Sequence, residues 1–457
     1  MIGAKYTQAY FVGIGGIGMS ALALYLKHHG LAVAGYDKTP SDITNRLERA
    51  GIEVSFVDNL TALPVHMQAA AENTLVIYTP AVPRDSELLA YFSAHNYERV
   101  KRAQALGMLV AEGQTLAVAG THGKTTTSTL LAHILRTAKV DFTGILGGVS
   151  SNYNSNLLLG GHKRFVVEAD EFDRSFLQLY PEMAVITSMD PDHLDIYGAA
   201  EHMTEAYNDF AAQVKTGGLL VYKHGMPLRL PAGVSAVSYG DGGQVQAQNV
   251  RIVDHKYHFD YLGATAIDDI ICGLPGIHNV ENAVAAITIA LAQGVAVEHI
   301  REAVASFKGV KRRFEYCIDR EDCVYIDDYA HHPTEIDALL ASVKQLYPGR
   351  KVLGVFQPHL YSRTRDFATA FARSLSQLDE LLLLDIYPAR ELPMPGITST
   401  WLLDQVTTSD KALVQKAELL DILSKKKFDV LLTIGAGDID RFVRPISELL
   451  QHKSPVR

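Results

Sequence analysis

The chain has 457 residues, which is too long for one hydrophobic core and suits about three domains of ~150 residues. Its formal net charge of −9 argues against a nucleic-acid partner, because such a partner needs a basic surface. Three cysteines without paired metal spacing fit a reducing compartment. With no signal peptide and no apolar run of ~20 residues, we expect a cytoplasmic protein without a membrane span.

Residues 1–107 alternate between strand and helix patterns, which predicts a Rossmann-like domain. Within it, Gly13-x-Gly15-x-x-Gly18 and Asp37, nineteen residues further on, match the dinucleotide fingerprint. Alone, this fingerprint favours NAD, and a tight turn without a ligand is the alternative. Physically, the fingerprint requires two things: a backbone that can approach a diphosphate, and a carboxylate that can bind a ribose. Any nucleoside diphosphate therefore satisfies it. The expected elements are strands at 10–12, 31–35 and 74–78, and a helix at 19–29.

Residues 108–309 carry the strongest motif, Gly-Thr-His-Gly-Lys-Thr-Thr-Thr at 120–127, between an apolar strand and a helical pattern. In such a loop, backbone N–H groups hold polyphosphate, Lys124 reaches the outer phosphates and the Thr125 hydroxyl can ligate Mg²⁺. The generic pattern has glycine where this chain has Val118, so the match is to a short form. A solvated lysine on a glycine-rich turn is the alternative, and we favour ATP binding.

Acidic residues follow two later strands of this segment, at 165–167 and 184–187. The first cluster begins at Glu168, and the second contains Asp192 and His193. A single acidic cluster is more often a solvated helix start, but two beside a phosphate loop favour metal binding. His193 is the less typical ligand, because Mg²⁺ prefers oxygen. Short alternating runs at 216–271 predict a flanking antiparallel sheet, followed by a helix at 283–292.

Residues 310–457 contain apolar strands at 324–326, 352–356, 381–384 and 430–434, which predict a sheet covered on both faces. Polar clusters lie near Arg312 and at 327–335 and 357–366. Arg312 and Arg313 form either a solvated basic turn or a phosphate contact. Because this segment lacks a phosphate loop of its own, we expect it to close over the nucleotide and bring a second substrate.

Together these motifs resemble the Mur ligases of peptidoglycan synthesis, from about residue 11 to residue 437. Within that family, the motifs at 13–20, 356–359 and 363–366 are most similar to members that join L-alanine to UDP-N-acetylmuramate. The resemblance rests on the phosphate loop, Glu168-Ala-Asp-Glu, Asp192-His193, His278-Asn279-x-x-Asn282, Arg312-Arg313-Phe314 and Asp327-Asp328-Tyr329-x-His331-His332-Pro333.

The resemblance implies an α/β fold of three domains: a Rossmann-like UDP-sugar domain at 1–107, a central P-loop ATPase-like domain at 108–309 and a Rossmann-like amino-acid domain at 310–457. In the implied reaction the lactyl carboxylate of UDP-N-acetylmuramate attacks the γ-phosphoryl of ATP. The L-alanine amine then displaces phosphate from the acyl phosphate and forms an amide. The implied cofactors are ATP and Mg²⁺, and the implied substrates are UDP-N-acetylmuramate and L-alanine. The resemblance is also compatible with a homo-oligomer.

The resemblance also assigns residues by motif position. The catalytic set is Lys124, Glu168, His193, Arg313 and His331, and the metal ligands are Thr125, Glu168 and His193. The ATP-binding residues are Gly120, Thr121, His122, Gly123, Lys124, Thr125, Thr126, Asn279, Asn282, Arg313 and Asp328. The UDP-sugar residues are Gly13, Gly15, Gly16, Gly18, Met19, Ser20, Asp37, Thr79, Pro80 and Ala81. The amino-acid residues are Tyr329, His331 and Arg363.

One position departs from the family pattern: Leu360 stands where an arginine is common, so Arg363 or Arg365 would have to hold the amino-acid carboxylate. Within the family, the alternative is a recycling ligase that joins a whole tripeptide to the same sugar nucleotide. From other classes, an NAD-dependent dehydrogenase leaves Lys124 unexplained. A nucleotide-gated binding module does not need the polar strand ends of the last segment.

Overall fold

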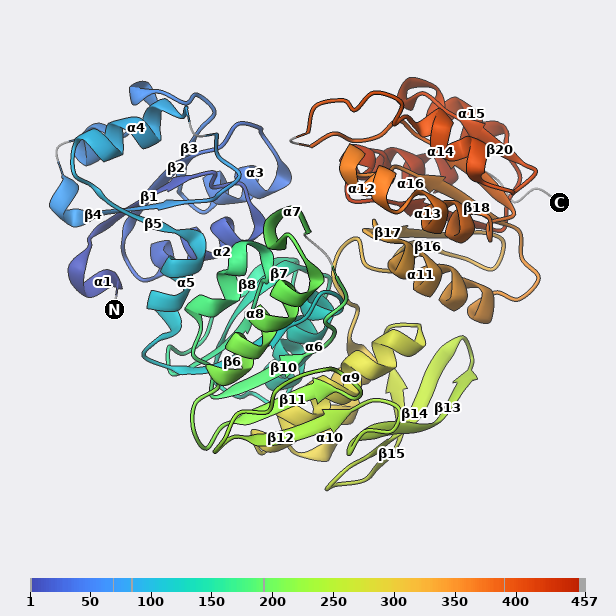
Figure 1. The fold of residues 1–457 in the computed structure, drawn as a ribbon, viewed down its shortest axis with the longest axis horizontal. Coiled ribbons are helices and arrows are strands. Elements are labelled where there is room, and N and C mark those ends of the chain that lie inside the picture. The colour runs from blue at the N-terminus through green and yellow to red at the C-terminus, as the bar shows by residue number, and fades with distance from the viewer. Residues whose placement is uncertain (1, 69, 84, 192–193, 390, 452–457) are drawn as a thin grey trace. The chain divides into compact units, whose positions relative to one another are not determined.

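The computed structural model describes residues 2–68, 70–83, 85–191, 194–389 and 391–451, which form an α/β fold with four sheets (Figure 1). The chain divides into two compact units: 1–250 with 258–272 and 281–308, and 251–257 with 273–280 and 309–457. The predicted α/β class is confirmed. The predicted domain boundaries at 107 and 309 stay predictions.

The first sheet has the strand order β3-β2-β1-β4-β5, and its strands are parallel. Its register pairs Val12 with Tyr36 and Tyr78, so the turn after β1 and the ends of β2 and β4 lie at one edge. The strands are Gln8–Val12 (β1), Ala32–Tyr36 (β2), Glu53–Ser55 (β3), Thr74–Tyr78 (β4) and Glu98–Lys101 (β5), and the helices are Ile2–Lys5 (α1), Ile17–His28 (α2), Asp42–Arg49 (α3), Glu87–Ala94 (α4) and Arg102–Val110 (α5).

The second sheet has the order β12-β11-β10-β6-β9-β7-β8, with only the β7–β8 pair antiparallel among its described pairings. Its strands are Gln114–Ala119 (β6), Thr143–Ser150 (β7), Ser155–Leu158 (β8), Arg164–Glu168 (β9), Met183–Ile186 (β10), Leu219–Lys223 (β11) and Ser235–Tyr239 (β12). The prediction of a flanking antiparallel sheet at 216–271 is wrong for β11 and β12, which extend the main sheet in parallel. Strand β12 lies at the edge of this sheet with β11 next to it, and both strands are partly exposed, unlike the fully buried parallel strands that give continuous apolar runs.

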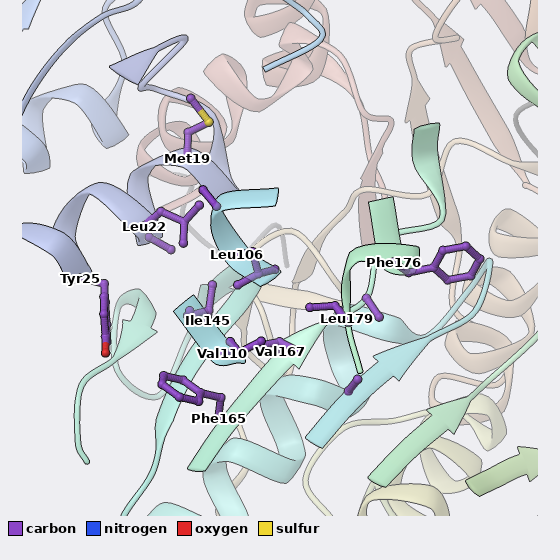
Figure 2. Packing of buried hydrophobic residues seen from close by; sticks show 14 of the residues in the cluster. Met19, Leu22, Tyr25, Leu106, Val110, Ile145, Phe165, Val167, Phe176 and Leu179 are labelled. Carbon is purple, nitrogen blue, oxygen red and sulfur yellow. The ribbon is translucent and has the colours of Figure 1, made fainter. Parts of the chain in front are cut away.

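One hydrophobic core connects these two sheets (Figure 2). Met19, Leu22 and Tyr25 project from α2, and Phe165 and Val167 from β9, into the same cluster of buried side chains. Helix α2 contacts β7 and β8, and α5 contacts the segment 172–178. Because α5 spans the predicted boundary at residue 107, the first sheet and the phosphate-loop sheet share their packing.

The second unit contains a sheet of order β16-β17-β21-β18-β19-β20, parallel except for β16–β17. Its strands are Glu315–Asp319 (β16), Val324–Asp328 (β17), Val352–Phe356 (β18), Glu380–Leu383 (β19), Lys411–Leu413 (β20) and Val430–Ile434 (β21).

The fourth sheet has Gln246–Val253 (β13), Lys256–Leu262 (β14) and Ile267–Cys272 (β15). The remaining helices are Lys124–Thr137 (α6), Leu194–Tyr197 (α7), Ala200–Ala212 (α8), Ile277–Ala292 (α9), Val297–Ser306 (α10), Pro333–Leu346 (α11), Tyr361–Asp366 (α12), Ala368–Leu375 (α13), Ser399–Gln405 (α14), Leu419–Lys425 (α15) and Val443–Gln451 (α16).

No helix within the described ranges combines the length and apolar character needed to cross a bilayer.

Candidate active site

The phosphate loop connects β6 to α6, as the sequence predicts. Gly120 and Gly123 have φ values of 131° and 80°, which favour glycine. A Cβ at Gly120 would lie 2.0 Å from Thr187 Oγ1, and one at Gly123 would lie 2.6 Å from Asn282 Oδ1. Both glycines are therefore required by conformation and by close approach. Val118 lies inside β6, so the loop has no need of glycine there.

The end of β10 holds this loop in place. The His122 N–H donates to Ser188 Oγ at 2.7 Å, and Thr121 Oγ1 donates to the Asp190 carbonyl at 2.8 Å. The Thr187 N–H donates to the Ala119 carbonyl at 2.9 Å. These bonds fix the loop before any ligand arrives, which lowers the cost of ordering it around an anion. Thr125 and Thr126, in the first turn of α6, are buried.

The Lys124 ammonium bonds back to the loop and to a carboxylate. It donates to the Gly120 and Thr121 carbonyls at 2.5 and 3.2 Å, and it lies 2.7 Å from Glu171 Oε2. Burial raises the pKa of Glu171 to about 7. The sequence motif placed Glu171 among the acidic residues but gave it no role.

The charge of Lys124 is maintained by its surroundings. Burial favours the neutral amine, but the carboxylates of Glu171, Glu168 and Asp170 outweigh this effect and raise the pKa of Lys124. A buried lysine that stays charged is the group needed to bind a phosphoryl oxygen.

Glu168 ends β9 beside the phosphate-loop strand, with which β9 is paired. Its Oε2 atom is buried and has no hydrogen-bond partner, and its carboxylate packs against the Gly147 backbone. A buried carboxylate oxygen without a donor suits a hard divalent cation. Glu168 and the Thr125 hydroxyl therefore fit Mg²⁺ as oxygen ligands. His193, the other predicted metal ligand, and its neighbour Asp192 lie outside the described residues.

The predicted UDP-sugar residues surround the turn after β1. The Gly15 N–H donates to Asp37 Oδ2 at 2.7 Å, and a Cβ at Gly13 would lie 2.5 Å from Thr79 Cγ2. Asp37 and Thr79 thus hold the turn from the neighbouring strands, and Gly15 already uses one Asp37 oxygen. Thr79 Oγ1 also accepts from the Ala81 N–H at 3.4 Å, and Pro80 precedes that residue as an exposed turn residue.

The remaining residues of this group begin α2. Gly16 is its N-cap residue with extended φ of −64°, so it needs no positive φ. Met19 is buried in the core, and Ser20 Oγ donates to the Ile17 carbonyl at 2.9 Å and accepts from Asn156 at 3.0 Å. The side chains of Met19 and Ser20 are thus used in packing.

Two cations at the end of β5 were missed by the sequence motifs. Arg102 Nη2 donates to Asp170 Oδ2 at 2.9 Å, and a Cβ at Gly18 would lie 2.9 Å from Arg102 Nη1. Lys101 Nζ donates to Asp173 Oδ2 at 2.7 Å. The signal available in the sequence was the position of two basic residues directly after a strand of the first sheet.

Residues of the second unit form their own cluster. Asp328 accepts from the N–H groups of Phe314 and Ala330, each at 2.7 Å, and burial raises the pKa of Asp328 to about 7. The Arg313 guanidinium lies 5.9 Å from the centre of the Tyr329 ring, a cation–π contact. Arg312 lies over the same ring at 5.2 Å and also donates to Asp327 at 3.1 Å, so of the two arginines it is the one held by a buried carboxylate.

The predicted amino-acid residues lie after β17 and β18. His331 Nδ1 is 3.4 Å from Glu335 Oε2, and its ring centre lies 6.0 Å from that of His359. Arg363 is buried in α12. Leu360, just before α12, has a φ of 68° and a ψ of 136°, which is strained for a residue with a side chain.

The two predicted asparagines lie on α9. Asn282 faces Gly123 in the first unit, whereas Asn279 Nδ2 donates to the Pro275 carbonyl at 2.7 Å in the second.

Each segment of the chain matches a family model. Residues 8–114 match "Mur ligase family, catalytic domain", residues 118–290 match "Mur ligase middle domain" and residues 312–437 match "Mur ligase, glutamate ligase domain".

The chain is also similar to curated and solved proteins over nearly its whole length. It is 52% identical to a UDP-N-acetylmuramate–L-alanine ligase of Flavobacterium psychrophilum, covering 98% of each chain. A solved UDP-N-acetylmuramate–alanine ligase of Thermotoga maritima has 28% identity and a TM-score of 0.84, covering 97% of this chain and 99% of the other. A solved murein peptide ligase of Psychrobacter arcticus has 23% identity and a TM-score of 0.70, covering 98% and 100%.

Proposed function

We infer that this chain, which belongs to the Mur ligase family, is an ATP-dependent ligase that joins L-alanine to the lactyl carboxylate of UDP-N-acetylmuramate. The observation that carries this proposal is the phosphate loop with its buried, charged Lys124, in a chain 52% identical to a ligase of that name. The reaction would proceed through an acyl phosphate.

Phosphoryl transfer to the lactyl carboxylate brings two anions together. Lys124 would hold the outer, β- and γ-phosphoryl groups, and the loop N–H groups would hold the neighbouring phosphates. Glu168 and Thr125 would hold Mg²⁺, which when bound neutralises phosphate charge, and the family motif adds His193 to that set. The buried, donor-free Glu168 oxygen supports this assignment.

The sugar nucleotide would bind at the carboxyl edge of the first sheet. Its diphosphate would lie against the turn at 13–18, as expected for the crevice at strand ends. The geometry supports a positioning role for Asp37 and Thr79, which hold the turn.

The second unit would complete the reaction. We propose that Asn279, Arg313 and Asp328 of this unit contact ATP, as does Asn282, which belongs to the first unit. Tyr329, His331 and Arg363 would contact L-alanine. The Tyr329–Arg313 cation–π contact and the half-buried Asp328 carboxyl, which accepts two backbone N–H bonds, support a preformed polar site on this unit.

The second candidate is the tripeptide ligase acting on the same sugar nucleotide. The higher TM-score of the alanine ligase, 0.84 against 0.70, favours L-alanine. The test is phosphate release by the full chain with UDP-N-acetylmuramate, ATP, Mg²⁺ and a panel of amino acids and peptides. We expect release with L-alanine. Release with a tripeptide alone would establish the alternative, and absorbance change with NADH would instead indicate a dehydrogenase.

A further inference from the structure

The ion pair between Lys124 and Glu171 occupies the lysine of the phosphate loop. Glu171 Oε1 and Oε2 lie 2.9 and 2.7 Å from Lys124 Nζ, and the two side chains are 12% and 1% exposed. With the Gly120 and Thr121 carbonyls, this carboxylate engages all three N–H donors of the ammonium. A phosphoryl oxygen can bind Lys124 only by replacing one of these acceptors.

The acceptor to be replaced is the carboxylate. The two carbonyls belong to the loop that encloses the phosphates, so an ammonium that keeps them stays in position to contact a phosphoryl oxygen. The carboxylate is the only one of the three acceptors that carries a negative charge. Exchanging it for a phosphoryl oxygen keeps the buried ammonium paired with one anion throughout.

The backbone of Glu171 is fixed in this position. The buried Tyr197 Oη donates to the Glu171 carbonyl at 2.6 Å. The charges of Asp170 and Lys124 act on the Glu171 carboxyl, and the charge of Glu168 also raises the pKa of Lys124. Three carboxylates thus surround one lysine, and a bound polyphosphate would add to their mutual repulsion.

We propose that Glu171 is a positioning residue for nucleotide binding: it holds Lys124 in place in the nucleotide-free protein and is exchanged for a phosphoryl oxygen when the nucleotide binds. This inference rests on the proposed function, because it requires the loop to bind ATP. The Lys124–Glu171 pair stabilises the nucleotide-free protein and by linkage opposes binding. Removing the carboxylate therefore strengthens nucleotide affinity while it destabilises the free protein.

The test is Glu171→Gln in the full chain, with ADP binding measured by calorimetry without Mg²⁺. We expect the dissociation constant to fall by about tenfold, as for loss of a competing charge pair. The melting temperature without ADP should fall, and the increase caused by ADP should exceed that of the wild type. If the role of Glu171 is only structural, the substitution will lower the melting temperature without tightening ADP binding.

Glu182→Gln is the matched control. Glu182 also pairs with a lysine of the first unit, Lys215, at 2.5 Å, away from the loop. This variant should leave the ADP constant unchanged. If Glu171→Gln binds ADP as tightly as the wild type does, or more weakly, the proposed exchange of Glu171 for a phosphoryl oxygen at Lys124 is wrong. If Glu171→Gln does not fold, Glu171→Asp, which withdraws the carboxylate by one methylene, must tighten ADP binding for the proposal to stand. A wild-type chain that binds no ADP would contradict the proposed function itself.

Discussion

Arg102 Nη2 donates to Asp170 Oδ2 across 2.9 Å, and this bond joins the end of β5 to the acidic segment that follows β9. The same guanidinium packs against Gly18, in the first turn of α2, directly after the glycine turn that we propose holds the diphosphate. Glu171, the neighbour of Asp170, contacts Lys124. The sugar-nucleotide turn and the phosphate loop are therefore connected through one arginine and one short acidic segment.

This position makes Arg102 a candidate for binding the sugar nucleotide. Arg102→Ala should raise the apparent KM for UDP-N-acetylmuramate by about tenfold or more, because a cation next to the diphosphate is lost. The KM for ATP should change by less than about twofold. The pair is 22% and 34% exposed and contributes ~0–1 kcal/mol, so the melting temperature should hardly move.

Arg99→Ala, at an exposed position of the preceding strand β5, is the control and should leave both constants unchanged. An increase in the ATP constant alone would place Arg102 in the nucleotide site instead.

Lys124→Ala should abolish turnover and leave binding of UDP-N-acetylmuramate by the full chain nearly intact. Loss of one preorganised charge at a phosphoryl transition state costs roughly 3 kcal/mol or more, about a hundredfold in rate. The substitution also leaves Glu171 buried without its lysine, so some loss of stability should accompany it. Phosphate release near the wild-type rate would contradict the assignment.

The local parts of this fold could be predicted from the sequence. Strands β4, β18 and β21 have the predicted bounds because each is a continuous apolar run ended by polar residues. The phosphate loop was predicted because all its parts are adjacent in the chain.

Contacts between distant segments could not be predicted in this way. Glu171 is 47 residues from Lys124, and Asp170 is 68 residues from Arg102. No spacing rule relates such residues, because their contacts depend on which strands become neighbours in the sheets. For the same reason, the neighbouring strands β11 and β12 were assigned to the wrong sheet.

Glu168→Ala should raise the Mg²⁺ concentration needed for half-maximal activity. The buried Oε2 atom accepts no hydrogen bond, so if it binds the cation, the substitution removes a ligand without breaking a bond to that atom. The measurement is a Mg²⁺ titration of phosphate release, with His193→Ala as the second predicted ligand. If the variant keeps its activity and its Mg²⁺ titration is unchanged, Glu168 has only a packing role.

Stability should depend on pH through His278. Burial lowers the pKa of His278 to about 4, so the folded protein holds the neutral ring. The unfolded chain binds a proton near pH 6.5, so the free energy of unfolding should fall as pH decreases from about 6.5 to about 4, by up to ~3 kcal/mol. His278→Gln should remove this part of the pH dependence. Parallel unfolding curves for both proteins between pH 7 and pH 5 would contradict it.

Leu360 and Arg363 lie at and just after the strained turn before α12. Arg363 is buried there, and Leu360 occupies the position where related motifs often carry arginine. If Arg363 anchors the L-alanine carboxylate, Arg363→Ala removes one member of a charge pair, a loss on the order of 2–5 kcal/mol. The apparent KM for L-alanine should rise at least about tenfold while that for ATP stays nearly constant.

Leu360→Arg should be tolerated, because arginine keeps an aliphatic stem in the same place and adds a donor. Kinetics of both variants with each substrate provide the measurement. A higher ATP constant with an unchanged L-alanine constant in Arg363→Ala would assign this arginine to the nucleotide.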